Sequence, residues 1–254
     1  MSSGNLRGAG ILITRPARQA AALAREIAAL GGKPIIFPAM VILPPEDVPA
    51  LARAQRELAS YDYAVFVSAN AVEYGVGDPA AWPAKLIAFA PGPGTAAALA
   101  AVGVTNARVP STTMDSEGLL ALPELQHAES KRVVIFRGGG GRELLADALT
   151  SRGAHVDYVE CYRRARPEAG AEGLEDALRE GRIDAVTLTS SEGLDNLWNI
   201  LGAAARDQFV AIPAFMPHAR IAARASKLGV RQTIVTEAAD AGLIAALLEY
   251  FAAR

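Results

Sequence analysis

The sequence repeats itself at an offset of 122 residues, and this internal duplication constrains the fold more than any other feature. Matching landmarks reveal it: an arginine after an apolar run, a glycine after a helical pattern, an aspartate before an apolar run and a proline closing a short strand. The pairs are Arg15 and Arg137, Gly31 and Gly153, Asp62 and Asp184, and Pro91 and Pro213. Beyond them the second copy is longer, because Gly103 and Gly229 lie 126 residues apart. We therefore expect two similar structural halves.

Each copy alternates short apolar segments with helical patterns. This alternation predicts an α/β fold, in which a doubly wound parallel sheet carries helices on both faces. The expected strands lie near 10–14, 34–37, 63–67, 86–90 and 106–109 in the first copy, and near 132–136, 155–159, 184–188, 209–212 and 232–235 in the second. Taken in chain order, the copies predict two consecutive five-stranded domains that meet near residue 125.

Composition narrows the class of protein. The chain has 254 residues, 51% of them apolar and 20% charged, so it can bury a core. A net charge of −2 gives no indication of a nucleic-acid or membrane surface. Cys161 is the single cysteine, which excludes an internal disulfide and is typical of a reducing cytosol. Met1–Gly10 lacks a signal-peptide pattern, and Pro91–Gly94 interrupts the uncharged stretch 86–107, so we expect a cytoplasmic protein without a membrane segment.

Candidate ligand contacts follow the expected strands. Ligands of doubly wound sheets bind beyond the carboxyl ends of the strands, where helix N-termini present unpaired N–H groups. Small polar residues or glycine occupy five such places: Thr14–Arg15, Ser68–Ala69–Asn70, Gly92–Thr95, Arg137–Gly141 and Thr189–Ser191. These turns predict edges rich in donors for carboxylates or phosphates.

Each of these turns also has a purely structural interpretation. The hydroxyls of Ser68, Ser190 and Ser191 are suited to capping helices, and the glycine run 138–141 can be a flexible turn. Arg15 and Arg137 occupy equivalent places in the repeat, which fits either structural pairing or contact with substrate. We favour substrate contact for at least one of the two arginines.

Several common chemistries find no support. His127, His155 and His218 are scattered, so no metal site is expected, and no nucleophile elbow, P-loop or Cys–His pair is present. The turn Gly92–Ala97 fits a dinucleotide-binding pattern only loosely, because it follows the fourth expected strand and no strand-end acid follows it. A nucleotide-dependent transferase remains an alternative, but no cofactor is expected. Tyr162 lies in an expected linker, where its hydroxyl either packs or donates to a ligand.

The motifs taken together resemble those of the uroporphyrinogen-III synthase family over about residues 10–250. The resemblance rests on Ile13–Pro16, Phe37–Pro38, Asp62–Val72, Pro91–Ala96, Ser116–Leu119, Phe136–Leu145 and Tyr162–Arg164. Two places depart from the family pattern. Ala90–Pro91–Gly92 stands where a Val-Gly pair is common, and the second copy has Pro217–Ala222 in place of a glycine-rich turn.

The resemblance implies a particular domain order. Family members have two flavodoxin-like domains that are interleaved and joined by a two-stranded linker. In this chain that order implies a discontinuous domain of residues 1–37 plus 165–254 and a second domain of residues 41–161. Residues 38–40 and 162–164 would form the linkers, which lie at equivalent positions of the repeat.

The resemblance also implies a reaction. The substrate would be hydroxymethylbilane, a linear tetrapyrrole with eight carboxylates. It is cyclised with loss of water and inversion of ring D, through a spiro intermediate, to uroporphyrinogen III for heme biosynthesis. No cofactor or metal is implied. A monomer is expected, with at most a transient contact to the preceding pathway enzyme.

The expected roles of individual residues follow from this reaction. Tyr162 would donate a hydrogen bond to the departing hydroxyl, and Thr95 with Gly94 would hold that hydroxyl or a carboxylate. The remaining expected substrate contacts are Arg15, Ser68, Ala69, Arg137, Gly138, Ser190 and Ser191. The alternative in another functional class is a two-lobed, non-enzymatic binding protein for an anionic metabolite.

Overall fold

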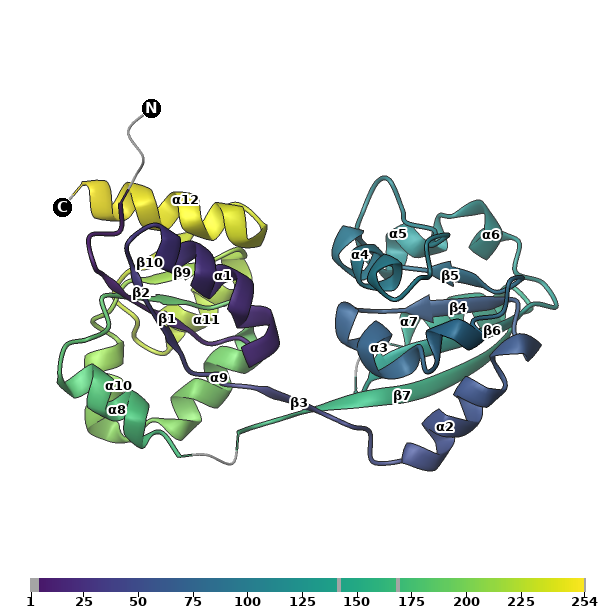
Figure 1. The fold of residues 1–254 in the computed structure, drawn as a ribbon, viewed down its shortest axis with the longest axis horizontal. Coiled ribbons are helices and arrows are strands. Elements are labelled where there is room, and N and C mark those ends of the chain that lie inside the picture. The colour runs from purple at the N-terminus through teal and green to yellow at the C-terminus, as the bar shows by residue number, and fades with distance from the viewer. Residues whose placement is uncertain (1–4, 141–142, 168–169, 254) are drawn as a thin grey trace. The chain divides into compact units, whose positions relative to one another are not determined.

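The computed structural model describes residues 5–140, 143–167 and 170–253 (Figure 1). The chain divides into two compact units, each with its own five-stranded sheet. Unit 1 comprises Met1–Val41 and Ala165–Arg254, and unit 2 comprises Ile42–Arg164. Unit 2 is thus inserted into unit 1, and the sheets are not built from consecutive halves that meet near residue 125.

The sheet of unit 1 has the strand order β10-β9-β8-β1-β2. β1 pairs in parallel with β2 and β8, and β9 pairs in parallel with β8 and β10. Numbered along the unit, this is the order 2-1-3-4-5 of a flavodoxin-like doubly wound sheet. The strands are β1 Gly10–Ile13, β2 Lys33–Ile36, β8 Ala185–Thr187, β9 Ala214–Met216 and β10 Thr233–Val235.

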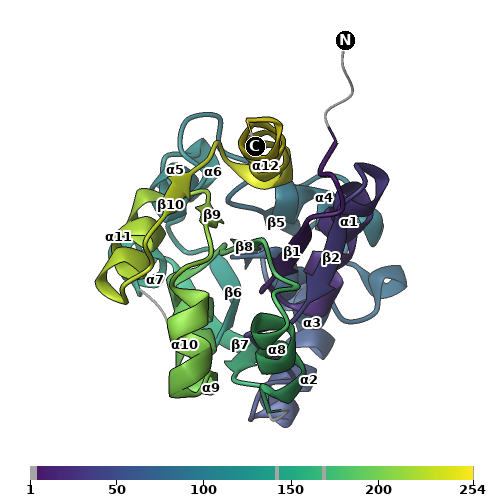
Figure 2. The same ribbon diagram turned by 90° about the vertical axis from the view of Figure 1, so that its left-hand side faces the viewer.

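Alternation along β1 shows why helices cover both faces of this sheet. Ile11 and Ile13 enter one core, and Leu12 enters the other, because successive side chains of a strand point to opposite faces. α1 and α12 cover the first face, and α8 to α11 cover the second; Figure 2 shows α1 and α12 across the strands from α8 and α10. The helices are α1 Ala17–Ala29, α8 Glu172–Arg179, α9 Ser191–Ile200, α10 Ala203–Phe209, α11 Ala219–Lys227 and α12 Ala239–Ala252.

The sheet of unit 2 has the order β3-β7-β6-β4-β5, and β4, β5, β6 and β7 pair in parallel. β6 and β7 are the first two strands of the second copy, whereas β4 and β5 belong to the first copy. The two copies of the repeat have therefore exchanged their first two strands. Each unit combines strands from both copies, and the equivalent strands have the same order in the two sheets. The strands are β3 Val41–Leu43, β4 Tyr63–Phe66, β5 Ile87–Phe89, β6 Arg132–Gly138 and β7 His155–Ala165.

Unit 2 is layered in the same way. Val134 and Phe136 of β6 pack in a core with α2, α3 and α4, and Val133 and Ile135 pack in a core with α5, α6 and α7. The helices are α2 Val48–Arg56, α3 Ala69–Gly75, α4 Pro93–Ala101, α5 Ser116–Leu120, α6 Pro123–Gln126 and α7 Leu144–Ser151, with short 3-10 turns at Leu58–Ser60 and Pro79–Ala81. The two-layered covering confirms the predicted doubly wound α/β class.

Two expected strands were misplaced. Residues 209–212 end α10 and its turn, and β9 begins after Pro213, so Pro213 precedes its strand whereas Pro91 follows β5. The additional helix α10 lengthens the second copy before β9. Near 106–109 only Arg108 forms a bridge, to Phe89. The next donor of that ladder would be Pro110, which has no N–H.

Residues 162–164, which were expected to form one strand of the two-stranded linker, lie in β7. β7 continues to Ala165, and β3 is its neighbour in the sheet of unit 2. Tyr162 therefore lies in a strand and has only 1% of its surface exposed. The alternating pattern of the sequence predicted a strand that ends near residue 159, because Cys161 and Tyr162 interrupt the period of two.

The glycine after the first helix of each copy behaves as predicted. Gly31 and Gly153 have φ angles of 76° and 82°, in the left-handed region that favours glycine. The N–H of the next residue donates to a carbonyl five residues back, which is Ile27 for Gly32 and Leu149 for Ala154. Both helices therefore end in the same glycine-dependent turn.

No helix in the described part of the chain is both long enough and apolar enough to cross a lipid bilayer.

Candidate functional site

A β-bulge at the end of β7 places the first candidate residue. Arg137 of β6 is paired with Glu160, but the next residue, Gly138, is paired with Tyr162, so β7 contains one extra residue at Cys161. The extra residue reverses the alternation, and Val159, Cys161 and Tyr162 all pack in the core that faces α3. Bulges commonly redirect a side chain in this way.

The redirected tyrosine meets a predicted serine. The oxygen atoms of Tyr162 and Ser68 are 3.1 Å apart, and either one can donate. Ser68 also caps α3, because its Oγ accepts a hydrogen bond of 3.1 Å from the Ala71 N–H. Ser68 therefore caps a helix and contacts Tyr162 at the same time, and its contact with substrate stays a prediction.

Gly138 is required by the position of the tyrosine ring. A Cβ atom built on Gly138 would lie 2.6 Å from both Cε2 and Cζ of Tyr162, closer than van der Waals contact allows. The Gly139 N–H donates to the Tyr162 carbonyl at 3.0 Å and holds the two strand ends together. The ring therefore packs directly on the backbone of Gly138.

Arg137 is a nearly buried cation, with 9% of its surface exposed. The guanidinium carbon lies 4.8 Å from the ring centre of Tyr158, and Nε donates to the Gly138 carbonyl at 3.3 Å. Within the described residues, no carboxylate is within ion-pair distance of the guanidinium. A buried cation without a counter-ion is costly, so this arrangement favours binding of an anion.

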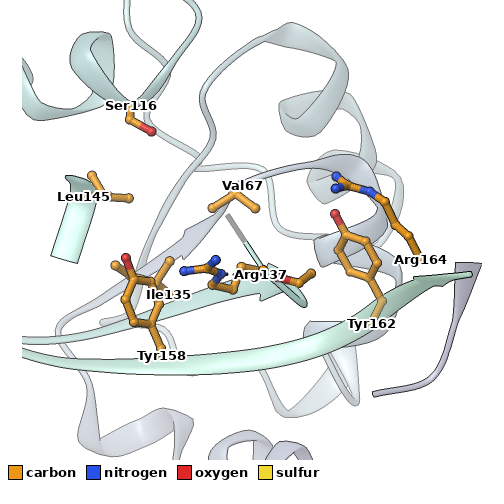
Figure 3. A pocket seen from close by; sticks show the side chains of 10 residues that line it. Val67, Ser116, Ile135, Arg137, Leu145, Tyr158, Tyr162 and Arg164 are labelled. Atoms are coloured by element: carbon orange, nitrogen blue, oxygen red, sulfur yellow. Dashed lines mark hydrogen bonds between the residues drawn. The ribbon is translucent and has the colours of Figure 1, made fainter. Parts of the chain in front are cut away.

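Arg137, Gly138 and Tyr162 line one pocket of about 270 Å³ in unit 2. Figure 3 shows Arg137 in its centre, with Tyr158 and Ser116 on one side and Tyr162 and Arg164 on the other. The full lining is Val67, Ser116, Ile135, Arg137, Gly138, Gly140, Leu145, Tyr158, Tyr162 and Arg164. The loop predicted at Arg137–Gly141 forms part of this wall, although Gly141 lies outside the described residues.

The bulged residue Cys161 is fully buried, and its Sγ lies 3.3 Å from the Arg137 carbonyl. Burial raises the pKa of the Cys161 thiol to about 12, from an ordinary value of 9.0. A raised pKa stabilises the folded state below pH 9, and this contribution is lost as the pH rises from 9 through 12.

Cys161 is therefore expected to resist thiol reagents in the native protein. At pH 8 the aromatic disulfide DTNB should react at the rate of transient unfolding, many times more slowly than with protein unfolded in guanidinium. Between pH 9 and 12, the free energy of unfolding should fall less steeply in Cys161→Ala than in the unaltered protein. Rapid reaction of the native thiol would show that the β7 bulge opens readily.

Ser190 and Ser191 lie at the corresponding strand end of unit 1. Ser190 caps α9, because its Oγ accepts a hydrogen bond of 2.9 Å from the Gly193 N–H, and Ser191 is the first residue of that helix. The neighbouring Thr14 hydroxyl donates to the Thr187 carbonyl at 2.9 Å. The hydroxyls of Ser190 and Thr14 have structural partners, and contact of Ser190 and Ser191 with substrate stays a prediction.

Arg15 is already paired in unit 1. Its two terminal nitrogens each lie 2.8 Å from a carboxylate oxygen of Asp240 on α12, in a bidentate ion pair. The two side chains are 13% and 32% exposed. The structure thus shows the structural alternative for Arg15 and leaves a substrate contact of this arginine as a prediction.

Removing the charge of Asp240 tests this pair. Asp240→Asn keeps the shape of the side chain but leaves a largely buried guanidinium without its counter-ion, so the free energy of unfolding should fall by about 1–3 kcal/mol. Chemical denaturation at pH 7 measures this value. Asp195→Asn is the matched control, because the pair between Asp195 and Arg224 is exposed. Equal losses in the two variants would contradict a partly buried, bidentate pair.

The remaining predicted residues lie outside the pocket lining. Thr95 is the third residue of α4 and is 7% exposed, whereas Gly94 and Ala69 are exposed at the first turns of α4 and α3. A Cβ atom on Gly94 would meet no atom within 4 Å. The surrounding atoms therefore leave room for a side chain at position 94. The roles of Thr95, Gly94 and Ala69 remain predictions.

Six pocket residues were not predicted as contacts from the sequence: Val67, Ser116, Ile135, Leu145, Tyr158 and Arg164. Ser116 had a usable signal, because residues 116–120 match residues 240–244 at an offset of 124. Both segments contain a tightly packed glycine. A Cβ atom on Gly118 would lie 1.9 Å from the Thr113 carbonyl oxygen, and one on Gly242 would lie 2.1 Å from that of Glu237.

No three His, Cys, Asp or Glu side chains are grouped closely enough to hold a metal ion across the ranges that the structure describes.

Comparison with known proteins assigns the family. The family described as uroporphyrinogen-III synthase HemD matches residues 21–245. The chain is 34% identical over 237 residues to uroporphyrinogen-III synthase of Escherichia coli, covering 91% of this chain and 96% of that protein. It is 39% identical over 196 residues to the synthase of Salmonella typhimurium, covering 75% and 79%.

Similarity to a solved structure extends over both units. A mutant uroporphyrinogen III synthase from the extremely thermophilic bacterium Thermus thermophilus superposes with a TM-score of 0.61 and 21% identity, covering 97% of this chain and 100% of that chain. At this identity the likeness shows the fold, while the family match and the bacterial relatives carry the assignment. The chain therefore belongs to the uroporphyrinogen-III synthase family.

Proposed function

We propose that this chain cyclises hydroxymethylbilane to uroporphyrinogen III, with loss of water and inversion of ring D, in heme biosynthesis. Family membership supports the reaction, and the pocket of unit 2 supplies suitable chemistry. One observation carries the assignment of the site: the Arg137 guanidinium and the Tyr162 hydroxyl lie at the same strand ends, in one pocket. The substrate brings carboxylates, a leaving hydroxyl and apolar pyrrole rings to such a site.

A substrate carboxylate is the proposed partner of Arg137. The guanidinium is held by the Tyr158 ring and the Gly138 carbonyl, so it is already oriented before a ligand arrives. A planar guanidinium binds a carboxylate through two parallel hydrogen bonds, and such charge-assisted bonds are stronger than neutral ones. Binding would also relieve the unfavourable burial of an unpaired cation.

Apolar surface for the pyrrole rings lies near the same strand ends. Val67 follows β4 directly, Leu144 begins α7 after β6, and Met114 would contact a side chain at Gly92. Their surfaces are 36%, 38% and 68% exposed. Exposed apolar side chains beside a buried cation suit a ligand with apolar rings and an acidic periphery.

Tyr162 is the proposed hydrogen-bond donor to the departing hydroxyl. Ser68 Oγ accepts the Ala71 N–H, so its own proton is available for the Tyr162 oxygen. That orientation leaves the Tyr162 proton free for the leaving group. The lone pair of a pyrrole nitrogen expels the hydroxyl, and a donor that stabilises the departing oxygen lowers the barrier to breaking the C–O bond.

Further carboxylate contacts are proposed from strand-end positions. In unit 2 these are Thr95 with Gly94, at the start of α4, and Ser68 with Ala69, at the start of α3. In unit 1 they are Ser190 and Ser191, whereas both terminal nitrogens of Arg15 are already bound to Asp240, so Arg15 is left out of the proposed contacts. Because Pro93 is the first residue of α4 and lacks an N–H, Gly94 and Thr95 offer that helix's first unpaired donors.

The isomer of the product tests the proposed function. Purified protein is supplied with hydroxymethylbilane, the porphyrinogens are oxidised, and the type I and type III isomers are separated by chromatography. Spontaneous closure gives the uninverted type I ring, so enrichment of type III is the expected result. A protein that binds the substrate and leaves the isomer ratio at its spontaneous value would instead be a non-enzymatic binding protein.

Cellular context is part of the same proposal. We propose a cytoplasmic monomer that needs no cofactor and contacts the preceding pathway enzyme at most transiently. The single cysteine, Cys161, is consistent with a reducing compartment. Light scattering coupled to gel filtration would measure the oligomeric state directly.

A further inference from the structure

The two units contain an arginine at the same structural position. Arg15 lies two residues after Ile13, the last residue of β1. Arg137 lies two residues after Ile135, the equivalent residue of β6. Ile13 packs in the core that α12 covers, and Ile135 packs in the core that α5 covers. Both helices begin with the matching segment that contains the tightly packed glycine, so residue 240 of α12 is equivalent to residue 116 of α5.

The residue at that helical position differs between the units. In unit 1 it is Asp240, whose carboxylate binds Arg15 through two hydrogen bonds of 2.8 Å. In unit 2 it is Ser116, which lines the same pocket as Arg137. One unit therefore carries its own carboxylate at this place, and the other carries a short neutral hydroxyl.

Nearby acids do not replace the missing carboxylate in unit 2. Asp115 caps α5, with its Oδ1 accepting a hydrogen bond of 2.9 Å from the Gly118 N–H. Glu160 lies near Gly139, where its Oε2 would be 3.6 Å from a Cβ atom on that glycine. Arg137 is only 9% exposed, and its terminal nitrogens have no acceptor among the described residues.

We infer that Ser116 is a specificity-determining residue, which keeps the Arg137 pocket open for a carboxylate of the ligand. This inference rests on the proposed function for the identity of the ligand. The ligand carboxylate binds Arg137 in the bidentate arrangement that Asp240 adopts with Arg15. The same place in unit 1 is closed by the protein's own carboxylate, so the duplicated site is used for anion binding in unit 2 alone.

The size and charge of residue 116 explain why the site is open to a ligand in unit 2 and closed in unit 1. An aspartate at this position would reach Arg137 from the helix, as Asp240 reaches Arg15, and would have no translational entropy to lose. A ligand carboxylate would then compete with a tethered one at high effective concentration. A serine is too short to neutralise the guanidinium, and its hydroxyl can still donate to a bound carboxylate.

Ser116→Asp is the decisive variant. It should raise KM for hydroxymethylbilane at least tenfold and weaken binding of uroporphyrin, a stable octacarboxylate probe, by a similar factor in fluorescence titration. Its Tm should be equal to or higher than that of the unaltered protein, because the new ion pair neutralises Arg137. A variant that merely disturbs folding would lower Tm instead. Ser111→Asp, an exposed position in the same connection, adds the same charge and should leave KM unchanged.

Two further variants keep the inference testable. Val67→Asp places a carboxylate on an exposed residue of the pocket wall and should also weaken uroporphyrin binding, even where Ser116→Asp fails to fold. Asp240→Asn, measured well below its Tm, should leave KM and uroporphyrin binding within about twofold of the unaltered protein, because unit 1 binds no carboxylate there.

The outcomes separate the inference from the proposed function. Absence of type III product from the unaltered protein refutes the function. An active protein in which Ser116→Asp and Val67→Asp both retain full affinity refutes the role of the open pocket. An active protein in which Asp240→Asn changes KM as strongly as Ser116→Asp refutes the division between the units.

Discussion

Replacement of Tyr162 by phenylalanine is expected to lower kcat by about 100-fold, the magnitude typical of losing one positioned donor. Only the hydroxyl is removed, so the ring still fills its place on Gly138 and against Tyr74, whose ring centre is 6.3 Å away. The lost hydrogen bond to Ser68 should cost about 1 kcal/mol of stability. KM should change little, because the hydroxyl acts on the departing oxygen.

Initial rates at saturating hydroxymethylbilane measure this effect. Tyr74→Phe is the matched control, since the Tyr74 hydroxyl donates to the Ile42 carbonyl at 3.2 Å and has no role in the proposed reaction. That variant should keep its kcat. Ser68→Ala should give an intermediate loss, because the tyrosine remains but its hydrogen-bond chain is broken. Unchanged turnover of Tyr162→Phe at saturating substrate would remove this residue from the chemistry.

Gly138→Ala is expected to reduce kcat as severely, while leaving every candidate catalytic side chain in the sequence. The new methyl group would lie 2.6 Å from two atoms of the Tyr162 ring. The strands cannot simply separate, because the Gly139 N–H is bonded to the Tyr162 carbonyl. The ring must therefore turn away from Ser68, and the overpacked contact should cost about 1–3 kcal/mol of stability.

A double-mutant cycle shows whether Gly138 acts through the tyrosine. In the Tyr162→Phe background, Gly138→Ala should lower stability again but cause little further loss of kcat. Gly139→Ala is the control, since its nearest neighbour would be a Glu160 oxygen at 3.6 Å. If Gly138→Ala keeps full turnover, or if its effect on kcat adds fully to that of Tyr162→Phe, the tyrosine is not positioned by this glycine.

Local patterns in the sequence were enough for the class of fold. The apolar segments with their period of two, and the helical segments that end at Gly31 and Gly153, depend on neighbouring residues alone. They therefore predicted the doubly wound sheets and most strands correctly. The polar strand ends pointed to Arg137 and Gly138, whereas Tyr162 was a candidate through its place in an expected linker and through the family resemblance.

Which strands of the two copies pair in one sheet depends on long-range packing. The offset of the repeat shows which segments correspond. It does not show which sheet they join, because the apolar faces are similar and the first two strands of either copy can complete either sheet. The exchange of strands between units 1 and 2 is therefore visible only in the fold, or through resemblance to a family. The same limit applies to Pro213, whose place before β9 depends on the additional helix α10.

The amino-acid sequence alone determined a duplicated α/β chain with donor-rich strand ends, because periodicity, glycine turns and proline breaks act within a few residues. The tertiary structure alone distinguished the two equivalent arginines. Arg15 binds Asp240 from a helix 225 residues away in the chain, whereas Arg137 lines a pocket that has Ser116 at the equivalent helical position. Likewise, the extra residue at Cys161 turns Tyr162 toward Ser68 only because β6 pairs with β7 in that register. Charge pairing and register arise between distant segments, and no local pattern records them.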